Sequence, residues 1–378
     1  MNLDLRSFLA LSTAMMVVMA VMFGLLRRSL PKGSPGLGHW TLGLVVLVLA
    51  GGLLAARGVL PDAVSVLAGN TALLAGTLWL LVGVRVFYGA PLRLMPWLGL
   101  IAATTVALHV TLFFQPLPGA RTAIVCVVWA ALLFQMARTI WRHDRLRFGA
   151  RFTIAVLAAH SVLVALRAAS ALISQANTDL LHPTPMQTVY LLANASMTLA
   201  LPFGLVLMSL ERLRDEIEFR ATHDALTGVL SRAPIIDLVD AEMHRSRRVG
   251  RPMCVCMIDI DHFKSVNDTH GHLVGDQALI AFTQRVSSVL RPYDRIGRYG
   301  GEEFLLLLPD ADAAAAHSVI ERVRAAVAVE NAPLPRLTAS AGLTEIRPTD
   351  ASVDALLGRA DAALYLAKAG GRDRVLTG

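Results

Sequence analysis

The stretch Arg298-Tyr299-Gly300-Gly301-Glu302-Glu303-Phe304 is followed directly by the apolar run Leu305-Leu306-Leu307-Leu308. The paired glycines predict a tight turn, because glycine adopts backbone angles closed to other residues and leaves room for a ligand to approach the main chain. Two adjacent carboxylates at such a turn are costly unless a cation or a substrate proton offsets their repulsion. The pattern predicts a metal-dependent site that faces a phosphate ligand. Taken alone, these letters also fit a solvated hairpin turn.

The composition of the chain is split between an apolar first half and a charged second half. Of the 378 residues, 55% are hydrophobic and 17% are charged, and the mean hydropathy is +0.56. These values are too apolar for a purely soluble protein. The net charge of +7 fits nucleic-acid binding or a membrane protein with Arg-rich cytoplasmic loops. We favour the second and expect no nucleic-acid partner.

Seven apolar stretches before residue 210 are long enough to cross a bilayer. They run at about 7–26, 39–57, 62–84, 95–115, 121–140, 152–173 and 187–209. Residues 1–209 are therefore predicted to form an all-α transmembrane bundle of about seven helices, in contact with membrane lipid. The first stretch also fits a cleaved signal peptide, but it is long and lacks a small-residue cleavage site, so we favour a retained helix.

Basic residues are concentrated in alternate connections between these stretches. The first, third and fifth connections hold most of the Lys and Arg residues, including Lys32, Arg93 and Arg142, whereas the sixth, 174–185, has none. Positively charged loops stay in the cytoplasm. The N-terminus is therefore expected outside and the C-terminal half inside.

Several polar residues lie within the apolar stretches. They are Asn70, His109, His160, Arg167 and Asn194. His160 and Arg167 are seven residues apart and share a helix face. Such groups often line a ligand pocket or a proton-sensitive site, and the alternative is hydrogen bonding between helices of the bundle.

Residues 210–221 turn abruptly polar and are predicted to form a short linker helix. Leu210, Leu213 and Ile217 fall at heptad spacing, which fits a parallel coiled coil in a dimer or a solvated helix. After it, the pattern predicts helices at about 232–248, 272–290, 313–329 and 353–368 and strands at 253–258 and 337–343. Cys254 and Cys256 are expected as buried strand residues rather than metal ligands.

The strand at 253–258 ends at Asp259-Ile260-Asp261, where carboxylates suit a hard cation such as Mg²⁺. Pairing of this strand with 305–308 is expected to bring Glu302 close to Asp259, as in two-carboxylate sites of phosphoryl transfer.

Four further polar or aromatic residues follow the strand. They are Phe263, Lys264, Asn267 and Asp276. Asn267 and Asp276 converging on one point are suited to the polar edge of a purine, and Lys264 to phosphate.

The order of these motifs resembles the GGDEF family of diguanylate cyclases, over about 222–378. The motifs are 224–232 (DALTGVLSR), 259–268 (DIDHFKSVND), 270–276 (HGHLVGD), 300–304 (GGEEF), and the closing residues Tyr365, Lys368, Gly371 and Arg372. Glu302 stands where the family usually has Asp, and Asp373 replaces the usual Asn. The resemblance implies an α/β domain with a palm-like, nucleotidyl-cyclase-type central antiparallel sheet surrounded by helices.

The resemblance also implies a reaction, in which two GTP molecules condense into cyclic di-GMP and two pyrophosphates across a homodimer. Asp259, the Ile260 carbonyl and Glu302 would hold Mg²⁺, with Mn²⁺ as an alternative. Glu302 would be the base, supported by Glu303. The remaining matched residues would bind substrate: Asn267 and Asp276 the guanine, and Phe263, Lys264, Lys368 and Arg372 the phosphates. Such a protein would reside in the bacterial inner membrane as a multi-pass sensor.

The segment Arg291-Pro292-Tyr293-Asp294 resembles the family's inhibitory R-x-x-D site. Five residues separate it from Gly300. Arg291 and Asp294 would bind the product, cyclic di-GMP, and Arg322 stands where a secondary contact is often found. A surface ion pair is the alternative.

An inactive domain that serves as a membrane-bound cyclic di-GMP receptor is the alternative function. The presence of Asp259, Glu302 and Glu303 favours the enzyme, because inactive members usually lose these carboxylates.

Overall fold

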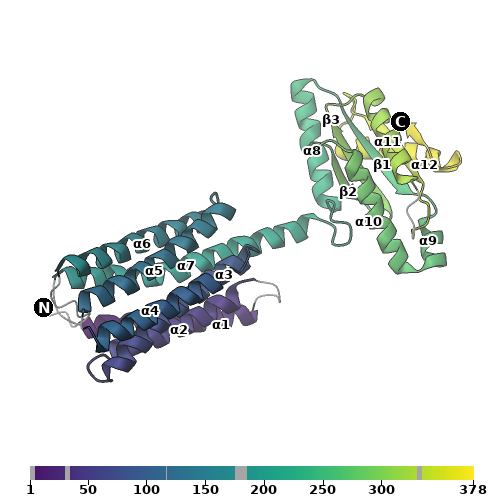
Figure 1. The fold of residues 1–378 in the computed structure, drawn as a ribbon. Helices are drawn as coiled ribbons and strands as arrows, with labels where there is room; N and C mark the ends of the chain where they lie inside the picture. Colours follow the sequence, from purple (N-terminus) through teal and green to yellow (C-terminus); the bar gives the residue numbers. More distant parts are fainter. Residues whose placement is uncertain (1–4, 30–34, 116, 175–184, 330–333) are drawn as a thin grey trace. The chain divides into compact units, whose positions relative to one another are not determined.

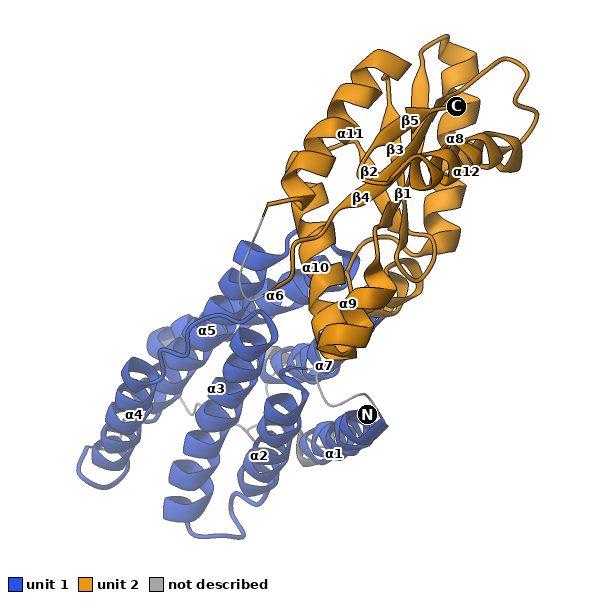
Figure 2. Cartoon of the chain, turned by 90° about the vertical axis from the view of Figure 1, so that its right-hand side faces the viewer, with its two compact units in different colours: residues 1–213 blue, residues 214–378 orange. Residues whose placement is uncertain are grey.

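A computed structural model describes the chain except for residues 1–4, 30–34, 116, 175–184 and 330–333. Two compact units divide it, residues 1–213 and 214–378 (Figure 2). Lys32 of the first basic connection and most of the sixth connection lie outside the described residues.

The first unit is helical throughout its described elements (Figure 1). Its elements are α1 (Leu5–Ser29), α2 (Leu37–Ala55), the π-helical segment η1 (Ala63–Ala68), α3 (Gly69–Phe87), α4 (Met95–Phe113), α5 (Pro118–His143), α6 (Phe148–Ser174) and α7 (Pro185–Thr222). Within the described residues, seven helices are long and apolar enough to cross a membrane, with η1 and α3 counting as one span. The predicted seven-helix bundle is confirmed at this level.

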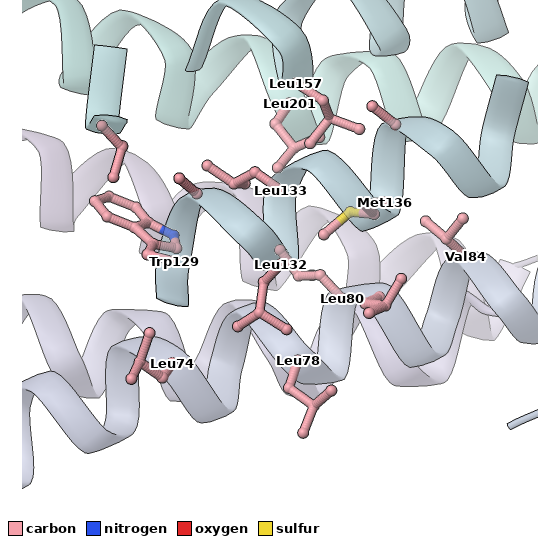
Figure 3. Packing of buried hydrophobic residues seen from close by; sticks show 14 of the residues in the cluster. Leu74, Leu78, Leu80, Val84, Trp129, Leu132, Leu133, Met136, Leu157 and Leu201 are labelled. Atoms are coloured by element: carbon pink, nitrogen blue, oxygen red, sulfur yellow. The ribbon is translucent and has the colours of Figure 1, made fainter. Parts of the chain in front are cut away.

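Helix α5 forms the centre of the bundle, since it packs against α3, α4 and α6. Leu132, Leu133 and Met136 of α5 are fully buried against Leu80 of α3 and Leu157 of α6 (Figure 3). The outer helices expose leucine and valine side chains instead, as expected where lipid replaces water. The interior of the bundle is therefore a close-packed apolar core around one helix.

The second unit begins within α7, which continues without interruption through the predicted linker. Its further helices are α8 (Arg232–Val249), α9 (Phe263–His270), α10 (His272–Val289), α11 (Ala313–Val327) and α12 (Val353–Ala369). Its strands are β1 (Met253–Ile260), β2 (Arg295–Arg298), β3 (Glu303–Pro309), β4 (Ala339–Glu345) and β5 (Val375–Thr377). The pattern had not predicted α9, β2 or β5 as separate elements, because each spans only a few residues.

The described strands form one sheet in the order β2-β3-β1-β4-β5. The first four are antiparallel to their neighbours, as predicted, whereas β5 pairs parallel to β4 at the edge and makes the sheet mixed. Strand β1 lies at the centre, and all its residues are buried. Its side chains alternate between two cores: Cys254 and Cys256 face α10 and α11, while Val255 and Met257 face α8 and α12. A strand covered on both faces reads as an unbroken apolar run.

Candidate active site

The C-terminal end of β1 and the glycine turn lie side by side. Strand β1 pairs with β3 so that Asp259 stands opposite Glu303, and the amide of Ile260 donates to the carbonyl of Glu302 at 3.3 Å. The predicted pairing of these two segments is confirmed. It places three carboxylates, those of Asp259, Glu302 and Glu303, at one end of the sheet.

Asp259 is 4% exposed and forms an ion pair with Lys368 of α12, whose Nζ lies 2.8 Å from Oδ2. Burial raises the pKa of the Asp259 carboxyl to about 6; Lys368 opposes this rise, and the negative charges of Glu302 and Glu303 add to it. Three carboxylates against one ammonium leave this end of the sheet with an excess of negative charge. A cation is the natural complement of such an arrangement.

The donor set at this point fits a hard divalent cation. Mg²⁺ takes one or two carboxylates and completes its shell with water and phosphate oxygens. Asp259, the Ile260 carbonyl and Glu302 offer that combination. Among the described residues no group of three or more His, Cys, Asp or Glu side chains is placed so that it could hold a metal ion, so a cage made wholly of protein side chains is not present there.

Asp261 lies two residues beyond Asp259 but faces a different set of partners. Its carboxylate accepts hydrogen bonds from Thr338 Oγ1 at 2.8 Å, Ser340 Oγ at 2.7 Å and the amide of Asp373 at 3.1 Å. A carboxylate satisfied in this way ties β1 to β4 and to the loop after α12. The sequence grouped Asp261 with Asp259 as carboxylates suited to a hard cation, whereas the fold gives Asp261 these hydrogen-bond partners.

The turn itself corrects one expectation. Neither Gly300 nor Gly301 has a positive φ, so the turn does not require backbone angles closed to other residues. Space is the constraint at Gly300, where a Cβ atom would come within 2.6 Å of Glu303 Oε2. The Glu303 carboxylate therefore folds back over the turn, and a side chain at position 300 would displace this carboxylate.

Arg298 holds this turn from β2. Its Nε and Nη2 donate to the Gly301 carbonyl at 3.1 and 2.7 Å, and its Nη1 donates to both carboxylate oxygens of Asp224 at 3.0 and 3.2 Å. Asp224 in turn accepts from the amide and hydroxyl of Thr227. The sequence motif includes Arg298 but does not indicate a role for it. Nothing in the spacing indicates that Arg298 meets a residue 74 positions away.

The predicted purine-binding residues come together at the α9–α10 corner. Gly275 lies so close to Asn267 that a Cβ there would collide with the Asn267 side-chain oxygen. Asp276, the next residue of α10, is exposed beside it. Phe263 is 6% exposed and packs in the core beneath α10, so it shapes the corner from below.

The remaining predicted phosphate contacts differ in their surroundings. Lys264 and Arg372 are exposed, and Arg372 has a φ of 64° in the loop that follows α12. Lys368, by contrast, already has an anionic partner in Asp259. Asp373, which replaces the family's usual Asn, pairs with Arg324 at 2.8 Å and so fixes this loop against α11.

The predicted inhibitory segment forms a compact turn after α10. Asp294 is 7% exposed, and its Oδ2 accepts the backbone N–H of Arg291 at 2.8 Å. The Arg291 and Arg322 side chains are exposed. Asp294 therefore stabilises its own turn through this hydrogen bond, while the Arg291 side chain stays exposed.

The family model described as "Diguanylate cyclase, GGDEF domain" matches residues 221–374. Over 161 residues the chain is 41% identical to the diguanylate cyclase DgcP of Pseudomonas aeruginosa, covering 41% of this chain and 24% of that protein. Over 167 residues it is 39% identical to the diguanylate cyclase DgcM of Escherichia coli, covering 44% and 40%. The chain thus spans less than half the length of these curated relatives.

A solved structure of the coiled coil and GGDEF domain of DgcB from Caulobacter crescentus, in complex with c-di-GMP, is 34% identical. It covers 45% of this chain and 94% of its own, with a TM-score of 0.42. Residues 221–374 therefore form a GGDEF domain, and the relatives over that domain are named diguanylate cyclases.

Proposed function

We propose that this protein is a membrane-bound diguanylate cyclase that condenses two GTP into cyclic di-GMP and two pyrophosphates. The observation that carries the proposal is the buried Asp259 at the end of β1, with Glu302 and Glu303 beside it and Lys368 paired to it. An inactive receptor would not need to keep three carboxylates in one place at the cost of their repulsion.

In the proposed reaction each domain supplies one GTP, and two domains of a homodimer face each other. The Glu302 carboxylate takes the proton of the 3′-hydroxyl of one GTP. That oxygen forms a bond to the α-phosphorus of the other GTP, and the bond from this phosphorus to the bridging oxygen of the β-phosphate breaks. Pyrophosphate leaves with the electron pair, and a second such step closes the ring.

The residues of the chain contribute charge and position to this step. A bound Mg²⁺, or Mn²⁺, held by Asp259, the Ile260 carbonyl and Glu302, would neutralise charge on the phosphates. Lys264 and Arg372 are exposed cations that would bind phosphate oxygens. Asn267 and Asp276 would accept and donate hydrogen bonds at the guanine edge, in the corner that Gly275 leaves open.

We further propose where the enzyme lies in the cell and how its product regulates it. The domain lies in the cytoplasm, the seven spans cross the bacterial inner membrane, and the N-terminus is outside. Product binds back at Arg291, Asp294 and Arg322 and lowers turnover. The basic first, third and fifth connections support the orientation. A green fluorescent protein fused after Gly378 should fluoresce, and an alkaline phosphatase fused there should be inactive; the reverse pattern would contradict this orientation.

The activity is tested by incubating the full chain in detergent with GTP and Mg²⁺ and measuring cyclic di-GMP by mass spectrometry. We expect product from the natural protein, at a specific activity that rises with protein concentration. Glu302→Gln should reduce turnover by about 10²- to 10⁴-fold, the range that general acid–base catalysis contributes. Asp237→Asn, an exposed carboxylate on α8, is the matched control and should leave turnover unchanged. Absence of product from the natural protein, together with binding of cyclic di-GMP, would favour a receptor.

A further inference from the structure

The first unit encloses a cavity that the cyclase reaction does not use. It has a volume of about 400 Å³, within the range of small-molecule sites, and its lining residues come from α1 to α7. Apolar surface makes up most of the wall, and four residues of the packed core seen in Figure 3 also line it: Leu80, Trp129, Leu133 and Leu201. The cavity therefore lies in the interior of the helix bundle.

Polar groups interrupt this apolar wall at several points. His160 is 3% exposed, and its Nε2 lies 3.0 Å from Oδ1 of Asn194 across two helices. The edge of Trp129 meets the His160 ring at a centroid distance of 5.1 Å. The other ring nitrogen, Nδ1, is buried and has no hydrogen-bond partner in the part of the chain that the structure describes. A buried polar atom without a partner is rare and calls for an explanation.

Arg167 lies two helical turns further along α6 and also lines the cavity. Its guanidinium carbon stands 5.0 Å from the centre of the Tyr190 ring. Its Nη2 is buried and likewise lacks a hydrogen-bond partner among the described residues. An aromatic face offsets part of the cost of a buried cation but accepts no strong hydrogen bond.

Arg167 brings a positive charge to the lining of the cavity, and the described lining residues include no Asp or Glu. A buried cation inside a membrane bundle normally pairs with an anion or faces water. The guanidinium fork matches a carboxylate in two parallel hydrogen bonds. The cavity thus combines a cation that can bind an anion with a wall that is mainly apolar.

From these contacts we infer that the cavity is a binding site for a single-chain amphiphile with a carboxylate head, such as a fatty acid. The carboxylate lies against Arg167 Nη2, and the acyl chain fills the apolar part. A phospholipid with two long chains exceeds a cavity of this size. The inference concerns binding alone and stands independently of the proposed cyclase activity.

Dodecanoate is a suitable probe, with dodecan-1-ol as a ligand of the same chain length without charge. Native mass spectrometry of the full chain released from detergent reads the mass of each bound molecule directly. We expect one dodecanoate per chain, binding at least about tenfold more tightly than dodecan-1-ol, because hydrogen bonds to charged groups are the strong ones. Dodecanoate should also raise Tm in a concentration-dependent way.

The variants separate a site from partition into an apolar space. Arg167→Met should weaken dodecanoate binding at least about tenfold and leave dodecan-1-ol binding unchanged, while Arg167→Lys should retain most of the preference. Arg151→Met, an exposed arginine of the same helix that does not line the cavity, is the matched control. If Arg167→Met does not fold, Arg167→Gln gives the same comparison.

Three results would overturn the inference. They are equal binding of dodecanoate and dodecan-1-ol, undiminished binding to a folded Arg167→Met or Arg167→Gln variant, and a stoichiometric two-chain phospholipid that dodecanoate does not displace. The last outcome would assign the cavity to a structural lipid instead.

Discussion

Lys368 Nζ lies 2.8 Å from Asp259 Oδ2, and this ion pair joins α12 to the C-terminal end of the central strand. The two residues are 109 positions apart in sequence, and the sheet brings them together. The pair holds the one carboxylate of the site that is nearly inaccessible to solvent. Because Lys368 lowers the pKa of Asp259 and Glu302 and Glu303 raise it, the protonation of Asp259 depends on all these charges.

The pH dependence of stability should report on Asp259. Because its folded-state pKa is raised to about 6 from 3.8, its protonated form stabilises the fold at low pH, and this contribution is lost as pH rises through 6. A shift of this size corresponds to about 3 kcal/mol as an upper figure. In EDTA, the Tm of the natural chain should therefore fall relative to that of Asp259→Asn between pH 4 and pH 7.

Added Mg²⁺ extends this measurement. At pH 7 it should raise the Tm of the natural chain and leave that of Asp259→Asn unchanged, since a cation that binds only the folded state stabilises it. Equal responses of the two proteins to Mg²⁺ would show that Asp259 is not a ligand.

Replacing Arg298 should disturb the glycine turn without touching any carboxylate of the site. Arg298→Met removes the fork that joins Gly301 to Asp224, and we expect turnover to fall about 10- to 100-fold through misplacement of Glu302. Loss of hydrogen bonds to a charged group should lower the free energy of unfolding by about 1–3 kcal/mol. Arg298→Lys should not rescue, because one ammonium cannot serve both partners.

A double-mutant cycle that combines Arg298→Met with Asp224→Asn tests whether Arg298 supports the turn through its contact with Asp224. A coupling energy of about 1 kcal/mol or more is expected for residues that share a hydrogen-bonded network. Strict additivity of the two substitutions in both stability and turnover would show that the Asp224–Arg298 contact does not support the turn.

Gly275→Ala should act on GTP binding. The added methyl group would collide with the Asn267 side chain and move it from its place beside Asp276. We expect KM for GTP to rise about tenfold or more, while kcat changes less, because the guanine contacts act at a distance from the reacting phosphate. Gly358→Ala on α12 is the control, since nothing lies within 4 Å of its added methyl. An unchanged KM would argue against Asn267 as a base-binding residue.

Product inhibition should separate Arg291 from Asp294. Arg291→Ala keeps the backbone N–H that Asp294 accepts, so the turn stays closed and only the exposed guanidinium is lost. Inhibition by added cyclic di-GMP should weaken at least about tenfold with no change in Tm. Asp294→Ala should weaken inhibition too, but also lower Tm because the turn loses its hydrogen bond. Inhibition that survives Arg291→Ala at full strength would remove this residue from the site.

Much of the molecule is predictable from local patterns. The apolar stretches predict the seven spans, because a bilayer of fixed thickness demands about 20 apolar residues for each helix. The unbroken apolar run 253–258 predicts a strand buried on both faces, and β1 confirms it. The order of the motifs predicts the family and, with it, the end of the sheet at which the carboxylates gather.

Short elements and long-range partners escaped this reasoning. Strand β5 forms only because β4 offers a free edge, and three residues carry no periodicity of their own. At the glycine turn the sequence predicted the right residues but the wrong reason for them. It predicted special backbone angles, whereas the fold shows that Glu303 occupies the space above Gly300.

The sequence by itself determined the seven long apolar helices, the order of the domain's main elements and the residues that gather at the end of β1. These follow from periodicity, hydrophobicity and spacing, which are local properties of the chain. Tertiary structure alone decided that Lys368 pairs with Asp259, that Arg298 joins Gly301 to Asp224, and that Arg167 faces a cavity. Such contacts link segments distant in sequence, and no local pattern encodes which polar group will meet which once the chain has packed.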